Sequence, residues 1–409
     1  MTIRKNCYLC CMISLSNRLN AMEESATLAM ARLSRTLRAE GKDIISLSLG
    51  EPDFHTPQFI KDEAIRAIEQ NYTTYTPVAG YDELREKIAH KLLRDNGLTY
   101  SKDQIVVSTG AKQAIANAVL SLVNPGDEVI IPAPYWVSYI EIVKLAGGIP
   151  VIIEASVEQD YKITGQQFEE AISSKTKMFI FSSPCNPTGS VYTKEELFSL
   201  AQVLEKHPNI AALSDEIYEH INFAGGHHSL AEFPSIFEQV ITVNGASKAW
   251  AMTGWRLGYL ASSKTIADAC NKIQGQFTSG TNSITQRAAM VAMDANPQIL
   301  QDMVNQFEKR RDLVLGYLQK IPGIKVNKPT GAFYLFPDVS AYFGTSYQNY
   351  TIANGNDLCM YLLQEANIAL VDGNGFGAPK CIRISYATSE EQLSIAMERL
   401  TEALSKLGQ

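Results

Sequence analysis

The segment VNGASKAWAMTGWRLG contains the residues with the clearest chemical potential in this chain. Lys248 lies there among small and apolar residues, where burial makes a charged ammonium costly and favours the neutral amine. A neutral lysine amine is a nucleophile that adds to carbonyl groups. Eight residues later, Arg256 offers a permanently charged guanidinium that can hold a phosphate dianion. Most lysines are solvated surface charges, but this pair predicts a site for a phosphorylated aldehyde.

A second candidate for phosphate binding is the segment STGAKQAI. A strand end, a turn at Gly110 and a helix start follow one another there, so the backbone N–H groups of Ala111 and Lys112 can face an anion. A glycine before a helix more often serves only a tight turn. The segment lacks the glycine spacing of nucleotide-binding loops, so neither ATP nor NAD is expected.

Two polar side chains follow an apolar strand in LSDEIYE. Asp215 could keep the ring nitrogen of a bound pyridine protonated, which would turn that ring into an electron sink. Tyr218 could donate a hydrogen bond to a phenolate oxygen on the same ring. A helix-capping aspartate and a core tyrosine are the ordinary alternatives, and they are disfavoured here only because Lys248 is also present.

Three further residues are candidates of unequal strength. Asn186, in the proline-rich turn SSPCNPTG, is expected to be an exposed and rigidly held amide, although a turn alone explains its neighbours. Trp136, in APYWVSY, is more often a core or interface aromatic than a stacking platform. Arg383 stands in the strand CIRISYA among apolar neighbours, so it needs an anionic partner and is suited to bind a carboxylate bidentately.

The elements that must position these residues alternate between short strands and helices. Apolar, β-branched runs such as 105–108 and 240–245 are separated by segments with helical periodicity, for example 111–123 and 194–207. This alternation predicts an α/β fold, with a mostly parallel central sheet that carries helices on both faces.

A smaller α+β domain is predicted towards the C-terminus. Strand-like runs at 331–339, 368–373 and 381–387 precede an amphipathic helix at 390–406, and residues 342–356 are expected to form a surface insertion. The predicted units are an N-terminal extension at 1–13, an arm with part of the small domain at 14–55, a large cofactor-binding domain at 56–305 and a C-terminal small domain at 306–409.

Composition excludes several classes of function. The chain has 409 residues, 45% of them hydrophobic and 19% charged, which is ordinary for a globular enzyme. A net charge of -7 without basic runs argues against nucleic acid, and no apolar stretch reaches the ~20 residues that span a bilayer. Seven cysteines, an odd number scattered along a long chain, favour a reducing cytoplasm over a disulfide framework.

The first residues require a separate interpretation. Cys7, Cys10 and Cys11 resemble half of a metal site, but no second ligand pair stands at suitable spacing, so no metal is expected. A signal peptide is also disfavoured, because polar residues follow the apolar run at once and no small-residue cleavage site is clear. We interpret Met1 to Cys11 as an extension before a second start at Met12.

Taken together, the segments resemble class I, fold-type I pyridoxal-phosphate aminotransferases. The resemblance is strongest to the prokaryotic-type aspartate aminotransferases, a branch that includes prephenate aminotransferases, and it runs from about Ser14 to the C-terminus. Nine ordered segments carry it: LSLGEPDF, YTPVAGYDELR, STGAKQA, PYWVSY, SPCNPTGSVY, SDEIYEH, SKAWAMTGWRLGY, GAFYLF and IRISYATS.

The resemblance implies pyridoxal 5'-phosphate as the cofactor and assigns a role to each candidate. Lys248 would be the Schiff-base lysine and the base for the proton shift, with Asp215 paired to the pyridinium nitrogen. Tyr218 and Asn186 would meet the phenolate oxygen, and Trp136 would stack on the ring. The remaining cofactor contacts would be made to the phosphate, by Arg256, Gly110, Ala111, Lys112 and Tyr75 of the other subunit.

Substrate binding and assembly follow from the same resemblance. Gly50 and Arg383 would bind the α-carboxylate of the substrate, with Asn186 and Trp136 nearby. Small amino acids and 2-oxo acids would be the ligands, aspartate or glutamate above all, and the protein would be a homodimer with shared active sites. Prephenate or aromatic substrates, and a C–S lyase or decarboxylase on the same scaffold, are the alternatives.

Two departures from the family pattern concern the phosphate and the substrate side chain. Many relatives carry a hydroxyl residue where this chain has Gly245, and a lysine where it has the run Glu23-Glu24-Ser25. A ligand-sensing regulator built on an aminotransferase-like domain is a rival of another class. It is disfavoured, because the ~40 residues before LSLGEPDF are too few and not basic enough for a DNA-binding domain.

Overall fold

The computed structural model describes residues 14–20 and 22–407, and its central element is a seven-stranded sheet. Strand β8 runs antiparallel to both of its neighbours, whereas the other strands are parallel. The expected α/β fold with a mostly parallel sheet is therefore confirmed. The strand order across the sheet is β2 (Ile105–Ser108), β8 (Gly258–Ala261), β7 (Val240–Gly245), β6 (Ala211–Asp215), β5 (Thr176–Ser182), β3 (Glu128–Ala133) and β4 (Ile149–Glu154).

Helices cover both faces of this sheet, as the nearly uninterrupted apolar strands predict. Neighbouring residues of β3 point in opposite directions: Val129 and Ile131 belong to one core cluster, and Ile130 belongs to the other. The first cluster contains side chains of α5 (Ala111–Leu122), α6 (Ser138–Ala146) and α9 (Lys264–Phe277). The second contains side chains of α3 (Gln58–Glu69), α4 (Asp82–Asn96), α7 (Gly165–Ala171), α8 (Lys194–Lys206) and α10 (Ser283–Asp294).

Local sequence signals set the bounds of several helices. Helix α4 ends at Gly97, whose φ of 67° lies in the left-handed region that glycine tolerates. Helix α8 begins after Thr193, whose side chain accepts a hydrogen bond from the Glu196 backbone in a capping box. Helix α5 begins immediately after Gly110, which has a φ of 85°. The start of α5 is therefore held directly at the end of β2.

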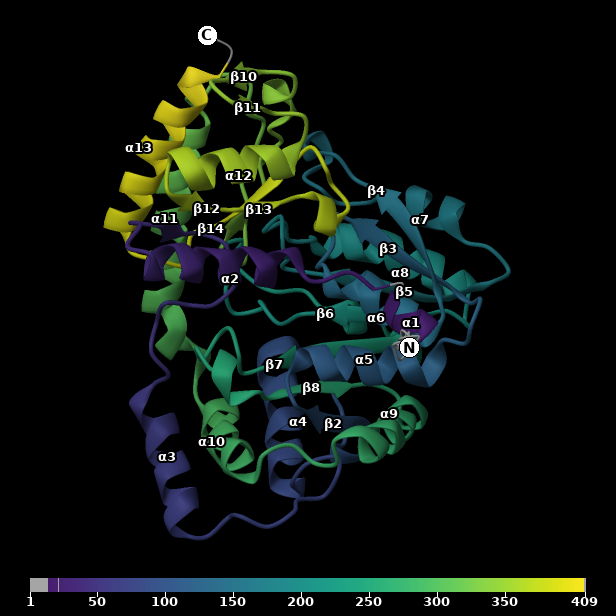
Figure 1. Cartoon of the computed structure of the whole chain (residues 1–409). Coiled ribbons are helices and arrows are strands. Elements are labelled where there is room, and N and C mark those ends of the chain that lie inside the picture. Colours follow the sequence, from purple (N-terminus) through teal and green to yellow (C-terminus); the bar gives the residue numbers. More distant parts are fainter. Residues whose placement is uncertain (1–13, 21, 408–409) are drawn as a thin grey trace, which may run out of the picture.

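A second, smaller group of elements lies above the main sheet in Figure 1. It combines segments from the N-terminal and C-terminal parts of the chain, because β1 (Ile45–Ser46) pairs in parallel with β12 (Ile368–Ala369). The boundaries at 55 and 305 remain a prediction. The other elements of the group are α2 (Ala26–Ala39), α11 (Gln301–Leu318), β9 (Tyr334–Leu335), α12 (Gly355–Glu365), β13 (Val371–Asp372), β14 (Ile382–Ser385) and α13 (Glu390–Lys406).

The strands of this smaller group are shorter than the sequence runs that predicted them. Only two residues of 331–339 form β9, and the run 368–373 divides into β12 and β13, which pair with different partners. Residues 342–356 contain a hairpin of β10 (Ser346–Tyr347) and β11 (Tyr350–Thr351). That segment is more than a surface insertion, because Ile352 is fully buried and Tyr350 packs edge-on against Tyr361 of α12.

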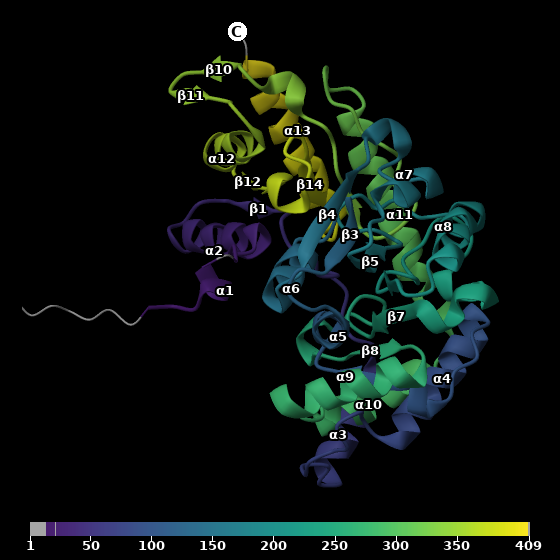
Figure 2. The ribbon, with the colours of Figure 1, turned by 90° about the vertical axis from the view of Figure 1, so that its right-hand side faces the viewer.

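The N-terminal arm lies beside the main body in Figure 2, with α1 (Asn17–Asn20) ahead of α2. The interpretation of residues 1–13, with their cysteine cluster, falls outside the described residues. Within 14–20 and 22–407, no helix combines the length and the apolar character needed to cross a membrane.

Close backbone packing between β8 and the start of α5 yields a testable expectation. A Cβ added at Gly258 would lie 2.2 Å from the Ala111 nitrogen, so Gly258→Ala should lower the free energy of unfolding by about 1–3 kcal/mol. Gly316 in α11 is the matched control: nothing lies within 4 Å of its added Cβ, and Gly316→Ala should stabilise by about 0.5–1 kcal/mol. Denaturant unfolding of both variants measures this, and equal effects would contradict the packing argument.

Candidate active site

The carboxyl ends of β2, β5, β6 and β7 meet around a cavity of about 340 Å³. Ligands of open α/β sheets bind at this edge, because the loops that follow the strands converge there. All of the residues predicted from the sequence line the cavity except Gly110 and Tyr75. Those that do are Gly50, Ala111, Lys112, Trp136, Asn186, Asp215, Tyr218, Lys248, Arg256 and Arg383.

Lys248, three residues beyond the end of β7, lines the cavity. Its Nζ donates a hydrogen bond to the Gly50 carbonyl oxygen at 2.6 Å and lies 5.7 Å from the centre of the Tyr218 ring. Burial lowers the pKa of Lys248 to about 8. The nearby charges act in both directions, with Glu51 and Asp215 raising the pKa and Arg383 and Arg256 lowering it. A substantial fraction of this amine is therefore neutral near physiological pH.

Asp215, the last residue of β6, is 5% exposed. Its Oδ2 accepts a hydrogen bond from the Tyr139 hydroxyl at 2.7 Å, and its Oδ1 accepts one from the Ile217 backbone at 3.3 Å. Burial raises the pKa of Asp215 to about 6, although both hydrogen bonds act in the opposite direction. Asp215 forms no ion pair with a described residue, so this buried carboxylate would gain from a positively charged partner in the cavity.

Positive groups gather at the end of the cavity near α5. The first N–H groups of a helix have no intrahelical acceptor, and those of Ala111 and Lys112 occupy these positions. Arg256, with a left-handed φ of 59°, donates to the Thr109 carbonyl, and a Cβ added at Gly110 would lie 2.4 Å from its Nη2. Burial and the proximity of Arg256 lower the pKa of Lys112. This end of the cavity is built for an anion.

Arg383 in β14 forms the opposite wall and is 2% exposed. Its guanidinium donates to Asn186 Oδ1 at 2.9 Å and to the Ser48 carbonyl at 2.6 Å. Its Nε–H is buried without a hydrogen-bond partner, and no acidic residue of the described chain pairs with it. Burial accordingly lowers the pKa of Arg383. The anionic partner that the sequence requires is thus left for a ligand to provide.

Asn186 differs from its expected setting. The sequence predicts an exposed amide, but the side chain is only 8% exposed, because Arg383 from the distant β14 covers it. Exposure of a turn residue depends on what packs against it from elsewhere in the chain, and the turn signal carries no such information. Asn186 still faces the cavity, where its amide holds the guanidinium in place.

A pair of tyrosines lies between Lys248 and Arg383. The Tyr218 and Tyr334 hydroxyl oxygens are 2.8 Å apart, and the Arg383 guanidinium carbon lies 4.7 Å from the centre of the Tyr334 ring. A Cβ added at Gly50 would lie 2.3 Å from the Tyr334 hydroxyl oxygen. Glycine at this position therefore allows the backbone to approach both Tyr334 and the lysine.

Several residues of the cavity were not expected from the sequence. Tyr139 and Tyr334 resemble ordinary core aromatics, and Ser182 lies within a buried strand. Ser247 could have been found, because it directly precedes the lysine in the sequence and lines the cavity. A side chain at Gly245 would approach the Leu257 carbonyl oxygen to 2.7 Å. Backbone crowding at the start of β8 thus leaves no room for a side chain at Gly245.

Tyr75 lies apart from the other predicted residues. It is 98% exposed, in the segment between α3 and α4, and it does not line the cavity of its own chain. Its predicted contact with the cofactor of another subunit remains a prediction.

Comparison with known proteins decides the family. The family model for aminotransferase class I and II matches residues 42–400, which include every predicted site residue. The chain belongs to the class I and II aminotransferases. The family resemblance seen in the sequence is therefore confirmed.

Relatives of this aminotransferase match nearly its whole length. It is 48% identical over 397 residues to a Petunia hybrida protein named bifunctional aspartate aminotransferase and glutamate/aspartate-prephenate aminotransferase, covering 96% of this chain and 83% of the relative. It is 46% identical to a probable aspartate/prephenate aminotransferase of Rickettsia bellii, covering 96% and 99%. The solved aspartate aminotransferase of Rhizobium meliloti matches with a TM-score of 0.93 at 39% identity, covering 97% and 100%. The Thermus thermophilus aspartate aminotransferase with maleate has a TM-score of 0.90 at 40% identity, covering 96% and 100%.

The lowered pKa of Lys248 makes the stability of the cofactor-free aminotransferase depend on pH in a defined direction. Between the folded value of about 8 and the ordinary value of 10.5, the unfolded state binds more protons, so wild-type stability rises with pH. Below pH 8 the buried ammonium destabilises the fold, and Lys248→Met should raise the free energy of unfolding by roughly 1–3 kcal/mol.

This gain should shrink as the pH rises from about 8 towards 10.5. Denaturant unfolding of the wild type and Lys248→Met at matched pH values measures it, with Lys175→Met at an exposed position as the control. A gain that stayed constant across this window would show that Lys248 is not a destabilising buried cation.

Proposed function

We propose that this aminotransferase uses pyridoxal 5'-phosphate to exchange amino groups between an L-amino acid and a 2-oxo acid. The observation that carries the proposal is the amine of Lys248, with a pKa of about 8, in the same cavity as two groups that can bind anions, the start of α5 with Arg256 and the guanidinium of Arg383. A nucleophilic amine, a phosphate site and a carboxylate site together match a phosphorylated aldehyde and an amino acid bound side by side.

The residues of the cavity fit this cofactor. The α5 amides, the Ser247 hydroxyl and Arg256 would hold the phosphate, and the missing side chain of Gly110 leaves room for Arg256 against the backbone. Asp215 would hold the ring nitrogen, since a protonated nitrogen supplies the cation that this buried carboxylate lacks. When bound, the cofactor would supply an electron sink that stabilises negative charge on the substrate α-carbon.

The chain's own groups then have separable tasks. Arg383 would bind the substrate α-carboxylate and so align the Cα–H bond with Lys248. The Lys248 amine would take the proton from the α-carbon and return it at the cofactor, because it lines the cavity and its pKa is lowered to about 8. The Tyr218 hydroxyl, held by Tyr334, would donate a hydrogen bond to the ring oxygen.

Aspartate or glutamate is the amino donor that the comparisons favour. The curated relatives and solved neighbours cited above are named for aspartate, and two of them also for prephenate. Ser25, Thr27 and Leu28 of the arm line the cavity, and the neighbouring Glu24 pairs with Arg32 at the surface. Prephenate or aromatic substrates form the second candidate, because two of these relatives are also named for prephenate.

Two monomers are proposed to complete each other's sites in a cytoplasmic homodimer. The support is Tyr75, an aromatic residue that is 98% exposed in the monomer and lies outside its own cavity. A tyrosine so exposed is unusual in a free monomer and is typical of an interface. Its hydroxyl would reach the phosphate of the partner's cofactor.

The function is tested by assaying the purified protein with a panel of amino acids and 2-oxo acids. Wild type loaded with pyridoxal 5'-phosphate should be yellow, and its visible absorption should change on adding aspartate or glutamate. Lys248→Ala should remove both the lysine-linked absorption and amino transfer, because the other amine of the cavity, Lys112, belongs to the anion-binding start of α5. Formation of a 2-oxo acid without transfer of the amino group to an acceptor would indicate a lyase instead.

Arg383→Lys tests the carboxylate site. Lysine keeps the charge but offers a point donor in place of a planar fork, so binding should weaken by about 1.5–3 kcal/mol. The specificity constant should fall by roughly one to two decades for aspartate, glutamate and any aromatic donor alike, because all share the α-carboxylate. Arg399→Lys, at a surface ion pair with Asp43, is the matched control. If Arg383→Lys changed only the order of preference among amino donors, Arg383 would bind the substrate side chain and not the α-carboxylate.

A further inference from the structure

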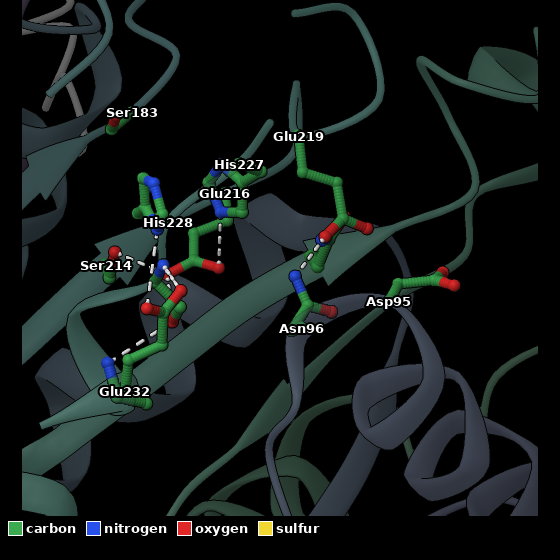
Figure 3. A network of polar contacts seen from close by, with 12 residues as sticks. Asp95, Asn96, Ser183, Ser214, Glu216, Glu219, His227, His228 and Glu232 are labelled. Carbon is green, nitrogen blue, oxygen red and sulfur yellow. Dashed lines mark hydrogen bonds and ion pairs between the residues drawn. The ribbon is translucent and has the colours of Figure 1, made fainter. Parts of the chain in front are cut away.

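Four ionisable residues at the end of β6 and in the turn that follows it lie on two sides of the chain. Asp215 and Tyr218 face the cavity, while Glu216 and Glu219 face away from it into a buried polar network. Figure 3 shows this network, with Glu216 near Ser214 and His227 and Glu219 near Asn96. The mechanism proposed above does not use either glutamate.

Glu216 is 1% exposed and fully hydrogen-bonded. Its Oε1 accepts from the hydroxyls of Ser214 at 2.8 Å and Ser229 at 2.7 Å, and its Oε2 lies 2.9 Å from His227 Nε2. Burial alone would lower the pKa of His227, but Glu216 raises it above the ordinary value. Glu216, the residue after Asp215, is therefore hydrogen-bonded to the segment 227–229.

Glu219 is held in the same way by the C-terminal end of α4. Its Oε1 forms a buried ion pair with Lys91 and lies 3.1 Å from His220 Nε2, and its Oε2 accepts from Asn96 at 2.9 Å. Burial alone would raise the pKa of Glu219, but Lys91 and His220 lower it well below the ordinary value. Glu219, the residue after Tyr218, is therefore held against α4.

The two carboxylates of the network have all their oxygens paired, whereas His227 Nδ1 is buried without a hydrogen-bond partner. Each carboxylate oxygen of Glu216 and Glu219 already accepts a hydrogen bond from a protein group, and Lys91 contributes a positive charge, so the geometry does not call for a metal ion. Buried ion pairs seldom stabilise a fold more than apolar side chains of the same volume would. What such pairs can add is a fixed geometry, because hydrogen bonds to both carboxylates restrict where the backbone lies.

We infer that Glu216 and Glu219 are positioning residues, which clamp the turn from behind and thereby fix the directions of Asp215 and Tyr218 in the cavity. The backbone supports this, since the Glu216 N–H also donates to the Val243 carbonyl of β7 at 2.8 Å. The inference rests on the proposed function, because the directions of Asp215 and Tyr218 matter for the reaction only if a cofactor ring binds in the cavity.

The test compares the loaded wild type with Glu216→Gln and Glu219→Gln. Both changes keep the shape of the side chain but remove the charge, and both should lower kcat between about tenfold and a hundredfold, with KM for the oxo acid changed much less. The pH titration of the visible absorption should also shift, since it reports the environment of the ring. Glu205→Gln, at an exposed position on α8, is the matched control and should leave all three quantities unchanged.

A double variant separates positioning from stability. Lys91→Met with Glu219→Leu removes both charges of the ion pair together, so the thermal midpoint should stay near or above that of the wild type. Low kcat and a shifted absorption titration in this stable protein would support the inference. Wild-type values of both in the double variant would overturn it, whether or not the single variants fold. A wild type without visible absorption or amino transfer would instead overturn the proposed function.

Discussion

The rest of the structure depends on the burial of unpaired ionisable groups in one cavity. Asp215 and Arg383 are buried and Lys248 is half-buried, and none of the three forms an ion pair with another described residue. Burial shifts the pKa of each group in the direction that favours its neutral form. A bound ligand of opposite charge would therefore stabilise the charged form of all three groups. Burying these groups lowers the stability of the fold, and a large, closely packed core must compensate for that loss. The seven-stranded sheet with helices on both faces forms this core.

Close backbone contacts then bring the charged groups to the same place. The antiparallel strand β8 lies between β2 and β7, so Arg256, just before β8, stands between the start of α5 and the lysine. Gly258 and Gly245 pair across β7 and β8, and neither has room for a Cβ. The absence of these side chains lets the phosphate site and the nucleophile belong to adjacent strands. Glycine at position 245 is therefore a packing requirement of this sheet.

Features encoded locally could be predicted from the sequence, and features created by distant contacts could not. The strand 105–108 and the helix 390–406 have the predicted bounds, because periodicity and capping residues lie within the segment itself. Asn186 was expected to be exposed and is buried, because its cover comes from β14. Tyr139 has no sequence signal for its hydrogen bond to Asp215, since a buried tyrosine is most often part of the core.

The same division explains why the reaction is better defined than the substrate. Atoms common to all amino acids would meet buried groups such as Arg383, whose geometry follows from strands and their partners. Substrate side chains would instead meet the arm, where Ser25 and Thr27 are half-buried and Leu28 is 59% exposed. Exposed contacts constrain few neighbouring residues, so an arm can change its charge without disturbing the core. Selectivity can therefore diverge between relatives at the arm while the chemistry stays fixed at the ends of the strands.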